Sequence, residues 1–70
     1  MGKNIGNLIS IQTSKLIRDG EMTLGEASII DRTLQEDQNF KDELSSRSTA
    51  EAIEIIRTKI AELLTSIREK

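Results

Sequence analysis

The side chains best suited to acid–base chemistry in this chain are carboxylates. Glu36 and Asp37 are adjacent, and Asp31 has the polar Gln35 one helical turn after it. The 70 residues include no cysteine and no histidine, which removes thiolate nucleophiles, imidazole bases and the usual ligands of zinc and haem. No glycine-rich phosphate loop accompanies the carboxylates, and Phe40 is the only aromatic residue. We therefore expect no enzymatic activity, no catalytic residue, no metal site and no cofactor.

The charge of the chain is small overall but unevenly distributed. Ten basic and twelve acidic residues give a net charge of −2. This charge does not favour nucleic acid or a membrane surface as partner, because both attract a concentrated basic surface. Most of the acidic residues fall within residues 19–43, and this acidic block is either a docking surface for a basic partner, such as a DNA-binding regulator, or a solvated helix face. Its acidic members are Asp19, Glu21, Glu26, Asp31, Glu36, Asp37, Asp42 and Glu43.

The composition indicates one small all-α domain spanning residues 1–70. Proline, tryptophan, tyrosine and valine are absent, and the apolar residues are almost entirely isoleucine, leucine and alanine. A sheet protein would instead be expected to contain valine, tyrosine, phenylalanine and tryptophan, with turn-forming proline and Asn-Gly pairs between short strands. We expect three helices, over about residues 7–19, 24–38 and 49–68, preceded by a flexible N-terminal tail at residues 1–6.

Helix-end signals set these boundaries. Gly20 suits the left-handed conformation that commonly ends a helix. Thr23 and Glu26 have the spacing of a capping box for the second helix, and Ser48 and Glu51 repeat it for the third. These five residues are the predicted helix caps.

The pattern between the second and third helices is weaker. Residues 37–48 are mostly polar, although Phe40 and Leu44 lie one helical turn apart. The segment is either the frayed end of the second helix followed by a loop, or a further helical turn or two. The helix propensities of its residues do not separate these alternatives. The Ser-Ser-Arg-Ser-Thr run favours a break near its end.

An apolar seam runs along the third helix. Its residues recur at spacings of three and four, as in the a and d positions of a coiled coil. One interpretation is an interface between copies of the chain in an intermolecular helical bundle. The other is that the seam covers the first two helices within a monomer. The predicted interface residues are Ile53, Ile56, Ile60, Leu63, Leu64 and Ile67.

The size of the chain favours self-association. Below about 70 to 80 residues one hydrophobic core rarely stabilises a domain by more than a few kcal/mol, and this chain lacks the residues for disulfides or a structural metal. We therefore expect a homodimer or a higher oligomer. A second apolar set in the first two helices is expected to form either the shared core or part of a partner groove: Leu16, Ile17, Leu24, Ala27, Ile30 and Leu34.

A helix-turn-helix fits the sequence poorly, although Gly20 makes a tight turn between the first two helices. The would-be recognition helix opens with Leu24 and Gly25 and carries Asp31 and Glu36. These carboxylates would repel the phosphate backbone. We therefore expect no direct binding to nucleic acid.

The stretch from Ile11 to Asp37 reads IQTSKLIRDGEMTLGEASIIDRTLQED. The order of a Leu-Ile pair, two polar residues, Gly20 with Glu21, then Ala27-Ser28 and Arg32 resembles the AraC negative regulators, small helical proteins of enteric bacterial pathogens. The resemblance implies an oligomeric anti-activator that binds an AraC-type virulence activator and blocks its dimerisation or DNA binding, and so represses transcription of fimbrial and virulence genes.

A second class of function uses the same helices differently. The chain would then be a phage- or plasmid-encoded assembly factor, or a secretion chaperone, acting as a small protein-interaction module. Residues 1–17 do not form the apolar core of a secretory signal, and no apolar run approaches the roughly 18 residues that span a bilayer. We expect a cytoplasmic protein with no membrane partner.

Overall fold

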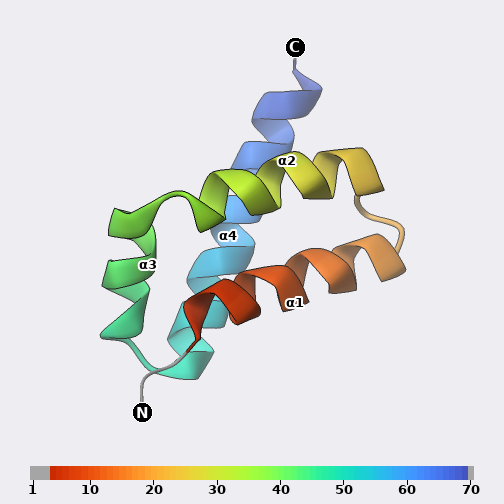
Figure 1. The fold of residues 1–70 in the computed structure, drawn as a ribbon. Coiled ribbons are helices and arrows are strands. Elements are labelled where there is room, and N and C mark those ends of the chain that lie inside the picture. The colour runs from red at the N-terminus through yellow and green to blue at the C-terminus, as the bar shows by residue number, and fades with distance from the viewer. Residues whose placement is uncertain (1–3, 70) are drawn as a thin grey trace.

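The computed structural model describes residues 4–69 and folds them into four α-helices without a strand (Figure 1). The helices are α1 (Ile5–Arg18), α2 (Leu24–Gln35), α3 (Gln38–Ser45) and α4 (Thr49–Arg68). The all-α prediction is confirmed, but the expected count of three helices is too low. Within residues 4–69 no helix is both long enough and apolar enough to cross a membrane.

The additional helix is α3, in the segment that the sequence left open. α2 ends at Gln35 rather than at residue 38, and the Asp37 carboxylate then accepts a hydrogen bond from the backbone N–H of Phe40, at 3.1 Å. Asp37 is thus the N-cap of a new helix. Leu44 is fully buried and anchors α3 to the rest of the fold. A local cap and one buried leucine therefore explain why these mostly polar residues form a helix.

The N-terminal boundary also differs from the expectation. α1 begins at Ile5, where Asn4 is the N-cap and its side chain accepts a hydrogen bond from the N–H of Asn7, at 3.0 Å. Ile5 is buried in the core. Residues 4–6 are therefore part of the folded domain and not of the expected tail, whereas residues 1–3 lie outside the described residues.

A short turn at Gly20 joins α1 to α2, and the two helices run back along each other (Figure 1). The N–H of Gly20 bonds to the carbonyl of Ile17 and the N–H of Glu21 to that of Leu16, both at 3.0 Å. This is the Schellman arrangement, which requires a left-handed residue after the helix. Gly20 supplies it with φ of +79°.

Alanine at the two exposed glycines is expected to change stability in opposite directions. Gly20→Ala should destabilise the fold by about 1 kcal/mol, because a Cβ at positive φ is strained although no other atom crowds it. Gly25→Ala should stabilise by about 0.5 kcal/mol, because Gly25 is helical and a Cβ there would make only an ordinary contact with the Thr23 Oγ1, at 4.0 Å. Urea unfolding followed by circular dichroism measures both. Equal shifts of the same sign would contradict the assignment of Gly20 to the turn.

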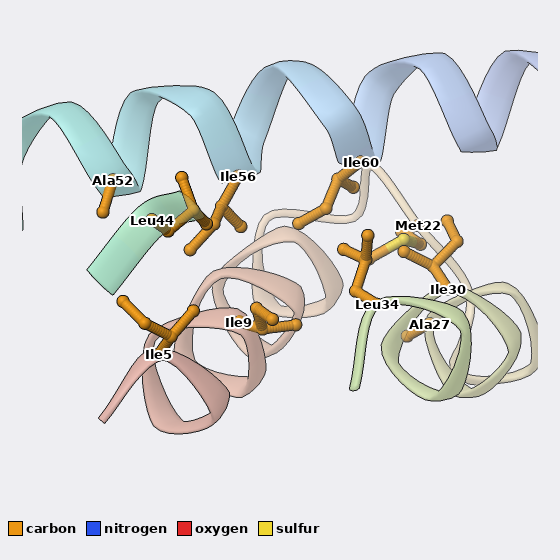
Figure 2. Packing of buried hydrophobic residues seen from close by; sticks show 10 residues of the cluster. All are labelled: Ile5, Ile9, Met22, Ala27, Ile30, Leu34, Leu44, Ala52, Ile56 and Ile60. Carbon is orange, nitrogen blue, oxygen red and sulfur yellow. The ribbon is translucent and has the colours of Figure 1, made fainter. Parts of the chain in front are cut away.

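The core lies where α4 crosses the α1–α2 pair, with α3 closing one end (Figure 2). Both capping boxes are present, so the five predicted caps lie at helix ends as expected. α4 spans the predicted residues 49–68, and its central side chains point into the core between α1 and α2. The buried cluster consists of Ile5, Ile9, Met22, Ala27, Ile30, Leu34, Leu44, Ala52, Ile56 and Ile60.

An ion pair fastens the end of α4 to the start of α2. The guanidinium of Arg68 donates to both carboxylate oxygens of Glu26, at 2.9 and 3.1 Å, and to the carbonyl of Glu21, at 2.9 Å. Glu26 also accepts from the N–H of Thr23 in the capping box, at 3.0 Å. The hydrogen bond from Arg68, followed by that from Thr23, lowers the pKa of Glu26 from 4.5 to about 2.

This pKa shift predicts how the contribution of Arg68 to stability depends on pH. A carboxylate with a lowered pKa stabilises the fold fully above its unfolded pKa of 4.5, and this contribution is lost as the pH falls toward 2. We expect the melting temperature of Arg68→Gln to lie below that of the wild type at pH 6. The difference should narrow as the pH falls toward 2, leaving the part that comes from the bond to the Glu21 carbonyl, which does not titrate. Arg57→Gln, at an exposed arginine without an ion pair among the described residues, is the control. A difference that persists unchanged at pH 2 would contradict the pairing.

Candidate functional site

The predicted interface seam on α4 lies mostly inside a single chain. Ile56 and Ile60 have no exposed surface, so they belong to the intrachain core. The structure therefore agrees with the alternative in which the seam covers the first two helices within a monomer, and the intermolecular bundle is not confirmed. Three further members, Leu63, Leu64 and Ile67, are partly buried and pack against the core. Ile53 is also partly buried.

The second predicted apolar set divides into three groups. Ala27, Ile30 and Leu34 are buried in the core, while Leu16 and Ile17 are partly buried against it. Leu24 is 75% exposed. It lies beside a shallow hollow between α1 and α2 that is otherwise lined mainly by small and polar residues. The set is therefore mainly shared core and does not form an apolar partner groove.

The candidate acid–base residues have structural roles. The Ser10 hydroxyl donates to the Asp31 carboxylate, at 3.3 Å, and the Gln35 amide donates to the carbonyl of Gly6, at 2.8 Å. These bonds link α2 to α1. Asp37 caps α3, as described above. Asp31, Gln35 and Asp37 therefore hold local structure, and Glu36 is the C-cap residue of α2.

An apolar hollow lies between α3 and α4, away from both predicted sets. It has a volume of about 440 Å³. Phe40 of α3 and Ile55 of α4 are partly buried and form its apolar part. We name this hollow the α3–α4 groove, and its lining residues are Phe40, Glu51, Glu54, Ile55, Thr58, Lys59 and Glu62.

The charges of the α3–α4 groove are mainly negative. Its three glutamates stand against one lysine, Lys59, whose ammonium lies 3.9 Å from the carboxylate of Glu62. Glu51 closes the capping box at Ser48. Glu54 pairs with no basic side chain of the described residues. A basic ligand would therefore meet a net negative charge of three glutamates and one lysine around an apolar floor, an arrangement that favours complementary charge on the partner.

The sequence analysis did not predict this groove, because the only charged surface that it proposed was the acidic block at residues 19–43. The residues that line the groove come chiefly from the other side of α4, where Glu51, Ile55, Thr58 and Glu62 recur at spacings of four, three and four. The spacing of these residues could have been recognised in the sequence, as that of the apolar seam was. What the sequence did not reveal is that α3 forms and places Phe40 against the stripe.

The acidic block itself does not form one site. Glu26 binds Arg68, and Glu43 pairs with Arg47 at 3.6 Å. Asp42 accepts a hydrogen bond from Gln38, at 2.8 Å. Its members are therefore spread over the turn after α1, over α2 and α3, and over the caps of these helices, where several of them hold local structure.

The residues that carry the resemblance to the AraC negative regulators also have structural positions. Gly20 makes the turn after α1, Ala27 is buried in the core, and Arg32 is exposed on α2. They thus define the α1–α2 pair and leave the α3–α4 groove outside the resembling stretch. Compared with known proteins, the chain matches no family model, no curated protein and no solved structure.

Proposed function

We propose that this protein is a non-enzymatic interaction module that binds a basic amphipathic helix of a partner protein in the α3–α4 groove. The observation that carries the proposal is the combination of an apolar floor, Phe40 and Ile55, with a rim that is mainly glutamate. Amphipathic helices bind such grooves through apolar anchors one turn apart. Basic residues beside those anchors would meet Glu54 and Glu62.

The length of the groove sets the size of the ligand. From Glu51 to Glu62 the lining extends over about three turns of α4, or roughly 16 Å at 1.5 Å per residue. A helix of about ten residues matches this length. The groove therefore suits one segment of a partner and not an extended protein surface.

The partner that we propose is a transcription activator of the AraC type, so that the protein acts as an anti-activator. The resemblance over residues 11–37 supports this class of partner. DNA-binding segments are rich in lysine and arginine because they contact phosphates. A basic helix held in the groove would be withdrawn from DNA, which represses transcription without any contact between this protein and the promoter.

The test is a binding measurement with a purified AraC-type activator and its promoter DNA. We expect a stoichiometric complex by light scattering and release of the DNA when the protein is added. The groove variant Glu54→Lys/Glu62→Lys should bind the activator at least about tenfold more weakly, since the reversed charges repel a basic helix. The control Asp19→Lys/Glu36→Lys changes the net charge equally at exposed positions outside the groove and should bind as the wild type does.

Two results would overturn parts of the proposal. Equal weakening by the groove variant and the control would show that net charge, and not the α3–α4 groove, governs binding. An activator that keeps its DNA and forms no complex with the wild type would remove the anti-activator function.

A further inference from the structure

α1 presents a basic face that no other part of the described chain covers. Ile11 is 47% exposed, and Lys15 and Arg18 follow it one and two turns later. Neither cation pairs with an acidic side chain among residues 4–69. One apolar anchor with cations at i+4 and i+7 has the spacing of a helix that binds in a groove.

This face matches the α3–α4 groove in charge and in length. Lys15 and Arg18 are opposite in sign to Glu54 and Glu62, and Ile11 would meet the apolar floor. From Ile11 to Arg18 the helix rises about 10 Å, which is within the roughly 16 Å of the groove.

The basic face cannot reach the groove of its own chain. Ile9 lies two residues before Ile11, so the two side chains project about 200° apart around the helix axis. Ile9 is fully buried and α1 packs against α4 in the core. Turning Ile11 toward the α3–α4 groove would pull Ile9 out of that core. The matching face must come from another molecule.

We propose that the α3–α4 groove binds the Ile11, Lys15 and Arg18 face of a second copy of this chain. The contact joins two different surfaces, so it is head-to-tail and leaves one free groove and one free basic face in each pair. Such a contact closes into a ring or extends into a chain of copies. A second copy of the chain and the activator helix would then compete for the same groove. This competition rests on the proposed function.

The experiment mixes two charge-reversed variants. Lys15→Glu/Arg18→Glu changes only the basic face, and Glu54→Lys/Glu62→Lys changes only the groove. We expect the mass of the wild type in sedimentation equilibrium to rise above the 7.8 kDa of one chain with concentration at low salt, and to fall on addition of salt. Each variant alone should associate at least about tenfold more weakly, whereas the equimolar mixture should associate again, because opposite charges then face each other.

The neutral variant Lys15→Gln/Arg18→Gln keeps the test valid if reversal at the end of α1 disturbs folding, and circular dichroism checks the fold of each variant. A wild type that stays at the mass of one chain at all concentrations would overturn the proposal, as would variants that associate as the wild type does. Activator binding is measured separately: a monomeric wild type that still binds the activator contradicts only the self-association. A self-associating wild type that binds no activator contradicts only the proposed function.

Discussion

Replacing Ile60 with aspartate is expected to unfold most of the protein. Ile60 is fully buried in the core between α4 and the α1–α2 pair (Figure 2). The substitution removes about 2 to 5 kcal/mol of apolar packing and adds the cost of burying a carboxylate that has no partner. A chain of this size has a free energy of unfolding of roughly 4 to 10 kcal/mol in total. Circular dichroism at 25 °C should therefore show the loss of most helix signal.

The matched control is Ile29→Asp. Ile29 has the same side chain on α2 but is 55% exposed, so the new carboxylate stays in water and the cost should be about 0.5 kcal/mol. If α4 instead formed an interface between otherwise stable monomers, Ile60→Asp would remain helical and only its mass would fall. That outcome would contradict the intrachain position of Ile60.

Replacing Leu44 with alanine is expected to destabilise the protein by about 3 kcal/mol and to release α3. Leu44 is the one residue of α3 that is fully buried, and a leucine-to-alanine change in a core costs about 2 to 5 kcal/mol. α3 has only eight residues, which is too short for a helix to be stable without packing. Amide hydrogen exchange by NMR should show faster exchange in α3 than the global loss of stability explains.

The release of α3 would also open the α3–α4 groove, because Phe40 would leave the stripe on α4. Ligand binding in the groove should therefore fall in Leu44→Ala even at temperatures where α4 remains folded. Asn39→Ala changes an exposed residue of the same helix and should alter stability by no more than about 0.5 kcal/mol. Uniform exchange across α1, α3 and α4 in Leu44→Ala would show that α3 does not separate from the rest.

Local signals in the sequence were sufficient for the turn after α1 and for the starts of α2 and α4. Thr23 with Glu26 and Ser48 with Glu51 form the predicted capping boxes, and Gly20 has the left-handed conformation that its position required. These features depend on residues three or four positions apart, whose geometry a single helical turn determines. The start of α1 was placed too late because its cap, Asn4, competes with a similar asparagine at position 7.

Nonlocal packing decided what the apolar faces do. The seam on α4 has the same periodicity whether it meets another chain or the α1–α2 pair, because periodicity defines a face and not its partner. The burial of Ile56 and Ile60 within the chain depends on the turn at Gly20, which brings α1 and α2 together under α4 (Figure 2). The seam was expected to provide the contact between copies of the chain. In our proposal the basic face of α1 and the α3–α4 groove provide this contact instead.

The sequence by itself determined an all-α protein, the ends of α4, the capping boxes and the turn between α1 and α2. Composition, helical period and contacts within one turn are all local properties of the chain. Only the tertiary structure decided that residues 38–45 are a helix and that Phe40 joins the acidic stripe of α4 to make a groove. The reason is that eight mostly polar residues gain their helical stability from burying Leu44, and this burial exists only after the other three helices have packed.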